Sequence, residues 1–301
     1  MFKNLILYRI APDWHAVATD VEARLQQAHF IECGASQDKS LGWIEPRGEG
    51  HGPLLEVVAS QWILKLMTET RALPASVVKR KVDERVAQIE ANTGRKPGKK
   101  ETRDLKDDIR LELLPMAFTK QVSTTVWIDR EAQLLVIDAG SQARADDVVT
   151  LLVQHLPGLA LTLVNTKVSP STAMADWLVS QEAPAGFSVD RECELKAADE
   201  SKAVVRYTRH PLDTEEVKQH IEGGKMPTRL ALTWNDRMSF VLTEGLQLKK
   251  LAFLDVVFEG AQTGKDDGFD ADVAIATGEL QKLLPAMLEA LGGETPLGMP
   301  A

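Results

Sequence analysis

Ten lysine and arginine side chains lie between residues 79 and 106, and they are the clearest chemical feature of this 301-residue chain. Five acidic residues accompany them, so the segment carries a net charge of +5, while the whole chain carries −9 and the remainder therefore −14. Because the charges are separated in this way, a polyanion is repelled by most of the chain but attracted to the basic segment. Nucleic acid is thus the first partner to consider. The cations that we expect to contact phosphates are Lys79, Arg80, Lys81, Arg85, Arg95, Lys96, Lys99, Lys100 and Arg103.

The basic segment has the pattern of two helices joined by a short loop. Apolar residues recur at helical spacing on both sides of residues 93–100, which contain two glycines, a proline and four cations. They are Val78, Val82, Val86 and Ile89 before the loop and Leu105, Ile109 and Leu113 after it. Two such stripes predict an antiparallel helical hairpin over residues 74–117, with a cationic tip that projects outward.

The basic segment also has two interpretations that do not involve nucleic acid. A charged helix face is often only a solvated face, and a basic arm could equally grip an acidic protein partner. Neither a helix-turn-helix, nor a zinc finger, nor an aromatic platform for single strands is visible in the sequence. Any nucleic-acid binding should therefore address the backbone, with little sequence preference.

A second candidate for chemistry is the set of carboxylates Asp270, Asp272 and Glu279. Carboxylates can hold Mg²⁺, so these three residues suggest a metal-dependent nuclease as the alternative function. The competing interpretation is a helix start at residues 269–272, where acidic side chains favour the helix dipole. The six histidines show no metal-ligand spacing, and we expect no metal, no cofactor and no catalytic residue.

The composition is that of an ordinary globular protein. Hydrophobic residues make up 44% and charged residues 26% of the chain, and no apolar run approaches the ~20 residues that span a bilayer. Cys33 and Cys193 fit no zinc or redox spacing, so we expect both to be small core residues in a reducing cytoplasm.

Strands and helices are expected in clusters without regular alternation, which predicts an α+β fold with antiparallel sheets and flanking helices. The expected strands are 2–10, 61–67, 124–128, 133–138, 160–164, 203–207, 228–234, 237–243 and 246–254. The expected helices outside the arm are 13–30, 143–156, 173–179 and 280–291. Residues 34–53 are expected to form a glycine-rich polar connection, and residues 295–301 a frayed tail.

The chain as a whole resembles the bacterial recombination-associated protein family RdgC. The resemblance rests on short motifs in the same order along nearly the entire chain, so we treat residues 1–301 as one RdgC-like chain of several subdomains. The motifs include Phe2-Lys3-Asn4-Leu5, Leu114-Pro115-Met116-Ala117-Phe118, Trp127-Ile128-Asp129, His220-Ile221-Glu222-Gly223-Gly224-Lys225 and Thr277-Gly278-Glu279-Leu280.

The resemblance implies a crescent-shaped subunit that pairs with a second copy into a ring-shaped homodimer with a positively charged hole. It further implies a cytoplasmic, nucleoid-associated protein without catalytic activity. Members of the family bind double- and single-stranded DNA without sequence preference, encircle the duplex, and limit the access of the RecA recombinase to DNA. No membrane partner is implied.

A contact that closes the ring is also implied by the resemblance. The family's gate phenylalanine corresponds to Phe118, for which a core aromatic is the alternative. The opposing Lys-Gln pair corresponds to Arg209-His210, so the first charge is retained and the glutamine is absent. The interface is expected, but its detailed bonds need not match those of the family.

Overall fold

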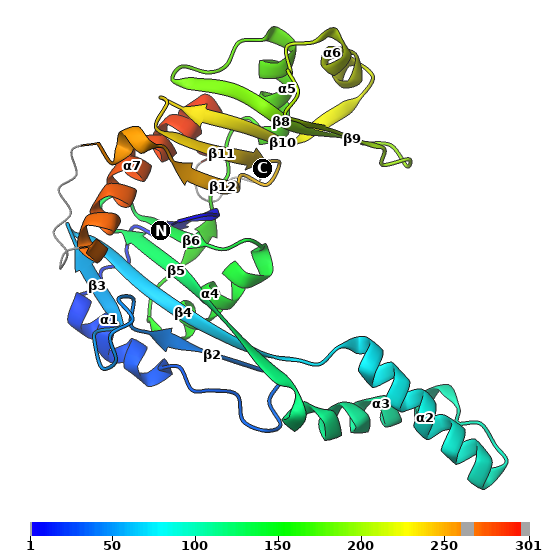
Figure 1. Ribbon diagram of the computed structural model, residues 1–301. Helices are drawn as coiled ribbons and strands as arrows, with labels where there is room; N and C mark the ends of the chain where they lie inside the picture. Colours follow the sequence, from blue (N-terminus) through cyan, green and yellow to red (C-terminus); the bar gives the residue numbers. More distant parts are fainter. Residues whose placement is uncertain (1, 260–267, 296–301) are drawn as a thin grey trace. The chain divides into compact units, whose positions relative to one another are not determined.

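The computed structural model describes residues 2–259 and 268–295 (Figure 1). Residues 296–301, most of the expected tail, lie outside this described part. The chain divides into two compact units. The first, called the body, contains residues 1–24, 45–64 and 125–301, and the second, called the arm unit, contains residues 25–44 and 65–124.

The body is built on a long antiparallel sheet. Its strand order is β4-β5-β6-β1-β12-β11-β10-β8-β9, with β3 beside β4 and β7 beside β1. The strands are β1 (Leu5–Ile10), β3 (Leu55–Val58), β4 (Gln61–Ala72), β5 (Phe118–Asp129), β6 (Leu134–Asp138), β7 (Leu161–Leu163), β8 (Phe187–Ala197), β9 (Val204–Thr208), β10 (Lys225–Trp234), β11 (Met238–Thr243) and β12 (Leu248–Phe253). β4 and β5 contribute residues to both units.

Helices cover the body sheet because alternate strand residues present an apolar face. Leu230, Leu232 and Trp234 of β10 are buried in one cluster with residues of α5 and α7. The helices are α1 (Ala18–Leu25), α4 (Gln142–His155), α5 (Pro170–Ser180), α6 (Glu215–Glu222) and α7 (Gly268–Ala290). α7 continues through Pro285 as one helix, so this proline does not divide it into two helical pieces.

The arm unit holds the predicted helical hairpin, which is confirmed as α2 (Ala75–Thr93) and α3 (Lys99–Leu113). Val78, Val82 and Ile109 form its small buried cluster. α2 ends at Gly94, whose φ of 69° is the left-handed conformation that glycine adopts at helix ends. The expected antiparallel α+β class is thus confirmed.

Three strands were not predicted. β2 (Lys39–Ile44) lies in the stretch expected to be a polar connection, and β3 (Leu55–Val58) follows that stretch. β8 (Phe187–Ala197) precedes the strand expected over residues 203–207. β2 pairs with the later part of β4 inside the arm unit, and its Trp43 is completely buried.

Two smaller expectations need correction. The helix expected over residues 13–30 is confined to α1 and the 3₁₀ turn Gln26–Ala28. Cys193 is buried as expected, but Cys33 is only half-buried, so it is not a core residue. Among the described residues, no helix has the length and apolarity needed to cross a bilayer.

Candidate nucleic-acid interface

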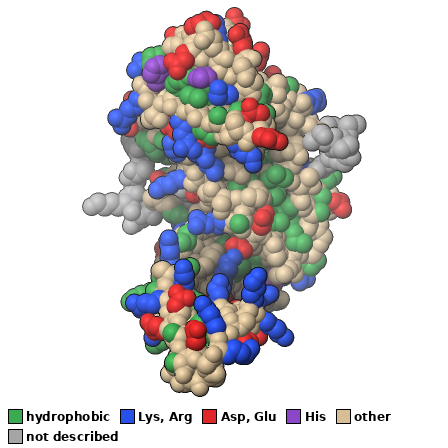
Figure 2. Space-filling view, turned by 90° about the vertical axis from the view of Figure 1, so that its right-hand side faces the viewer, with side chains coloured by type: hydrophobic (Ala, Val, Ile, Leu, Met, Phe, Trp, Pro, Cys, Tyr) green, Lys and Arg blue, Asp and Glu red, His purple; other side chains and the backbone are tan. Residues whose placement is uncertain are grey.

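The cations of the arm are all exposed to solvent. Lys and Arg side chains surround the arm, with Asp and Glu side chains between them (Figure 2). Six of the ten make no ion pair with any residue that the structure describes. They are Lys79, Lys96, Lys99, Lys100, Arg103 and Lys106. Three of these six, Lys96, Lys99 and Lys100, lie in or next to the loop between α2 and α3, so the tip of the hairpin offers unpaired positive charge.

The other four cations contact carboxylates within the arm. Arg80 and Lys81 lie 3.8 and 3.2 Å from the carboxylate of Glu84. Arg85 of α2 lies 3.6 Å from Glu112 of α3. All of these side chains are 49% or more exposed, so each pair contributes little to stability but offsets part of the positive charge.

Glu101 has two roles at the tip. Its carboxylate accepts a hydrogen bond from the backbone N–H of Gly98 at 2.8 Å, which caps the start of α3, and it pairs with Arg95 at 2.6 Å. The Gly98 hydrogen bond, followed by the Arg95 contact, lowers the pKa of the Glu101 carboxyl. Arg95 is therefore the one tip cation that shares its charge with a carboxylate of the described chain.

Arg71 connects two segments at the base of the arm by hydrogen bonds to their backbone oxygens. Its guanidinium donates to the carbonyl oxygens of Cys33 and Gly34 at 3.2 and 3.1 Å. It also donates to three carbonyls between α3 and β5, namely Leu114, Pro115 and Ala117, at 3.2 to 3.5 Å. The buried Nε of Arg71 has no acceptor among the described residues. One side chain thus orders the segment that leads into Phe118.

Phe118 is 85% exposed, so the alternative of a core aromatic at this position is wrong. Met116, two residues before it, is 70% exposed. A single exposed apolar side chain is common, but two large ones close together in the sequence are unusual. Exposed apolar patches often mark contacts with other molecules. Two large apolar side chains are thus exposed directly before and at the start of β5.

Arg209 and His210, the other predicted gate residues, lie in the body after β9, and both are exposed. Arg209 has a φ of 55°, a left-handed conformation that is strained for an arginine. The backbone N–H of His210 donates to the carbonyl of Arg191 at 3.2 Å, and its ring lies 5.5 Å from that of Tyr207. This turn is therefore held in place by β8 and β9.

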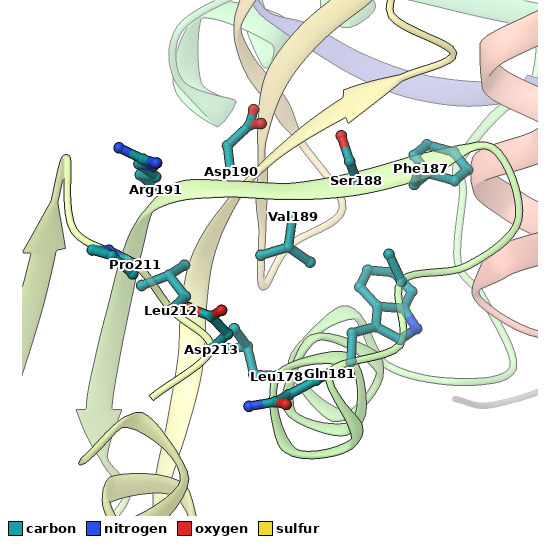
Figure 3. A pocket seen from close by; sticks show the side chains of 12 residues that line it. Leu178, Gln181, Phe187, Ser188, Val189, Asp190, Arg191, Pro211, Leu212 and Asp213 are labelled. Atoms are coloured by element: carbon teal, nitrogen blue, oxygen red, sulfur yellow. The ribbon is translucent and has the colours of Figure 1, made fainter. Parts of the chain in front are cut away.

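Beside this turn lies a hollow of about 570 Å³ between β8, α5 and residues 211–213 (Figure 3). Val189 and Leu212 face the hollow, and Trp177 and Phe187 supply further apolar lining. Ser188 and Asp190 also border it, but they point to the opposite side of the strand (Figure 3). The hollow has a lining of mixed polar and apolar side chains, and it lies next to the exposed Arg209-His210 turn.

The predicted nuclease site is not assembled. Asp270 pairs with Arg47 at 2.5 Å, and buried Glu279 accepts hydrogen bonds from Arg237 at 2.6 and 2.9 Å. The Arg237 hydrogen bond is the main reason why the pKa of Glu279 is lowered. Asp272 is exposed near the start of α7. No group of three His, Cys, Asp or Glu residues in the described part of the chain could hold a metal ion.

Comparison with known proteins identifies the relatives of this chain. The family model described as "Putative exonuclease, RdgC" matches residues 1–294. The chain is 47% identical to the recombination-associated protein RdgC of Dechloromonas aromatica, over 97% of this chain and 98% of that protein. It is 46% identical to the protein of the same name in Cupriavidus pinatubonensis, with the same coverage.

A third relative, the recombination-associated protein RdgC of Herminiimonas arsenicoxydans, is 43% identical over 97% of this chain and 98% of its own. The family model and the relatives agree over almost the full length, which confirms the resemblance inferred from the sequence motifs. The chain belongs to the RdgC family of recombination-associated proteins.

Proposed function

We propose that this chain is a DNA-binding protein that holds double- and single-stranded DNA by the backbone, without sequence preference. The observation that carries the proposal is the set of six exposed arm cations that lack a carboxylate partner within the described residues. Unpaired cations in an acidic protein gain most from a polyanion, because phosphates release their counterions when such side chains approach. The acidic remainder of the surface discourages binding elsewhere.

The names of the relatives support a role in recombination. The relatives are named recombination-associated proteins. We propose that two copies form a ring around duplex DNA in the nucleoid and limit the access of the RecA recombinase, without a catalytic step. A ring that must open before DNA escapes gives slow dissociation even when each phosphate contact is weak.

The closing contact of the ring is proposed to join Phe118 of one copy to the Arg209-His210 turn of the other. Phe118 is 85% exposed and follows a segment ordered by Arg71. The recess lined by Val189 and Leu212 adjoins the turn and includes apolar side chains against which an aromatic ring can pack. The described ion pairs do not involve Arg209, so its charge is available to a partner.

A salt titration tests the DNA proposal. Fluorescence anisotropy with a labelled 30-base-pair duplex compares the wild-type protein with an Arg95/Lys96/Lys99/Lys100→Ala variant. Removal of four phosphate contacts should reduce the slope of log affinity against log salt by about 3 to 4. The matched control removes four cations of the body, Lys167, Lys196, Lys202 and Lys218, by substitution with alanine. Unchanged affinity and slope in the arm variant would remove the arm from the interface.

Replacement of Phe118 tests the closing contact. Phe118→Ser removes an exposed apolar ring, so it should leave the melting temperature of the fold unchanged while weakening self-association by tenfold or more. Analytical ultracentrifugation over a concentration series measures this. The control is Val256→Ser, another exposed apolar residue at 40% exposure. Wild-type association of Phe118→Ser would contradict the proposed contact.

A further inference from the structure

Trp14 differs from the other tryptophans of the chain. The chain has six tryptophans, and Trp43, Trp62, Trp127, Trp177 and Trp234 are all buried. Trp14 is only half-buried, in the irregular segment between β1 and α1. Its indole N–H has no acceptor among the described residues. A large aromatic surface in contact with water invites a ligand that stacks on it.

Two other segments of the body lie beside this indole. Trp62, at the start of β4, meets the Trp14 ring edge-on at 6.4 Å and 81°. Arg130, in the turn between β5 and β6, places its guanidinium 4.7 Å from the centre of the Trp62 ring. Trp62 is 2% exposed, so it is a rigid support for both neighbours. Trp14 and Arg130 are therefore held near each other, although they are distant in the sequence.

Two hollows flank Trp14. One, of about 90 Å³, is lined by Trp14, His15 and Arg130 together with Ile10 and Gln133. The other, of about 170 Å³, is also lined by Trp14 and His15, and it includes Arg24, Asp20 and Leu156. Each hollow thus combines the aromatic ring of Trp14 with an arginine and His15. Flat aromatic rings beside guanidinium groups are the means by which proteins hold unstacked bases and the phosphates between them.

We propose that Trp14 and Arg130 form a second DNA contact, which stacks one unpaired base of single-stranded DNA. The proposal rests on the proposed DNA binding and adds to it a site in the body that distinguishes strand type. Bases within a duplex are already stacked on one another, so only a single strand or a frayed end can offer a free base to Trp14. Arg130 and Arg24 are the cations that would meet the adjoining phosphates.

The test measures single-stranded and duplex DNA in parallel. Trp14→Ala should weaken binding of a 20-residue oligo-dT about tenfold, at the lower end of what one base stack contributes, and leave duplex binding within twofold. Trp14→Phe retains a flat ring and should recover most of the affinity. Arg130→Gln should weaken oligo-dT binding by several-fold, while Arg144→Gln on α4 is the matched charge control. Equal oligo-dT binding by wild type, Trp14→Ala and Arg130→Gln would overturn the proposal.

Tryptophan fluorescence gives a second readout that does not depend on affinity alone. Five of the six indoles are buried, so quenching by oligo-dT should come mainly from Trp14 and disappear in Trp14→Phe. Titration with dTMP separates a strand site from a nucleotide pocket, because a strand site should show quenching by the oligonucleotide only. Quenching of equal size in Trp14→Phe would also overturn the proposal.

Failure of this site can be told apart from failure of the proposed function. Suppose that the four-cation arm variant loses duplex binding while the Trp14 variants bind oligo-dT normally. This result would support the arm interface and contradict the stacking site. If the wild-type protein binds neither DNA form at moderate salt, both the proposed DNA binding and the stacking site are wrong. Circular dichroism melting of each variant confirms that Trp14→Ala remains folded before binding is compared.

Discussion

The body and the arm unit use their charged residues differently. In the body, Arg237 pairs with Glu279, whose side chain is 7% exposed, and Arg47 pairs with Glu56, whose side chain is 10% exposed. In the arm, Arg85 and Glu112 are both at least half exposed. The body also has an extensive buried apolar cluster, whereas the arm hairpin buries only Val78, Val82 and Ile109 of its described residues in one cluster.

This difference separates structural charge from charge available for binding. A cation that neutralises a buried carboxylate cannot leave it without a large penalty, so it is committed to the fold. A cation on a thinly packed hairpin contributes little to stability and can exchange a carboxylate, or water, for a phosphate. We therefore expect mutations in the body to act on folding, and mutations of charges on the arm to act on binding.

The largest expected effect contrasts the two cores. Trp127 is completely buried in the body, and its indole N–H donates to Gln61 at 2.8 Å. Trp127→Ala should lower the free energy of unfolding by about 4 kcal/mol. Ile109→Ala should cost about 2 kcal/mol, confined to the small arm cluster. Urea unfolding with hydrogen-exchange mass spectrometry measures both.

The exchange pattern decides whether the two units unfold independently. Ile109→Ala should increase exchange in α2 and α3 and leave β1 and β6 at wild-type protection. Equal loss of protection in β1 would show that arm and body unfold as one cooperative unit.

A smaller effect is expected for the buried ion pair. Arg237→Ala leaves the buried Glu279 carboxylate with only Lys282 nearby among the described residues, at 3.2 Å, and should cost about 2 kcal/mol at pH 7. This figure is below the usual cost of breaking a buried pair because Arg237 is 34% exposed. The control is Arg110→Ala, since Arg110 and its partner Asp38 are both more than half exposed. Its cost should stay below about 1 kcal/mol.

The Arg237 pair also predicts a pH dependence. The pKa of Glu279 is lowered in the folded protein, so its contribution is fully present above the ordinary glutamate pKa of about 4.3 and is lost as the pH falls through the lower folded value. Arg237→Ala should remove much of this loss. Stability curves of wild type and variant should therefore converge below about pH 4, and a constant difference down to about pH 2 would contradict the assignment.

The smallest effect concerns the carboxylates of the arm. Glu84→Gln with Glu112→Gln releases Lys81 and Arg85 from their partners, so duplex affinity should rise about two- to fivefold at low salt. The control is Asp107→Asn with Asp108→Asn, which removes the same charge from exposed residues that make no ion pair with the described part of the chain. Equal gains in both variants would mean that net charge alone matters, and that ion pairing within the arm does not tune binding.

The arm was predictable because its signals are local. Apolar residues at helical spacing place Val82 and Ile109 at the helix contact, and Gly94 ends α2 where the sequence predicts a break. The strand β2 was missed because glycine usually interrupts strands. At Gly42 glycine is required, because an added Cβ would lie 2.3 Å from the Cα of Phe30.

β8 carries a signal that could have predicted it. Phe187, Val189, Cys193 and Leu195 place apolar residues at every second position except Arg191, while Glu194 pairs with Arg206 of β9. The Trp14 site could not be predicted, because Trp14, Trp62 and Arg130 come from separate segments that only the tertiary fold brings together. The exposure of Phe118 likewise depends on packing rather than on residue type.

Arg71 has a consequence for how this protein can vary. Its five acceptors are main-chain oxygens, which every amino acid supplies, so residues such as Cys33, Gly34 and Ala117 can change without removing an acceptor. Position 71 has no such freedom, because the single ammonium nitrogen of lysine cannot span both segments as a forked guanidinium does. The residues whose carbonyl oxygens accept these hydrogen bonds can therefore be substituted, whereas the donor Arg71 cannot.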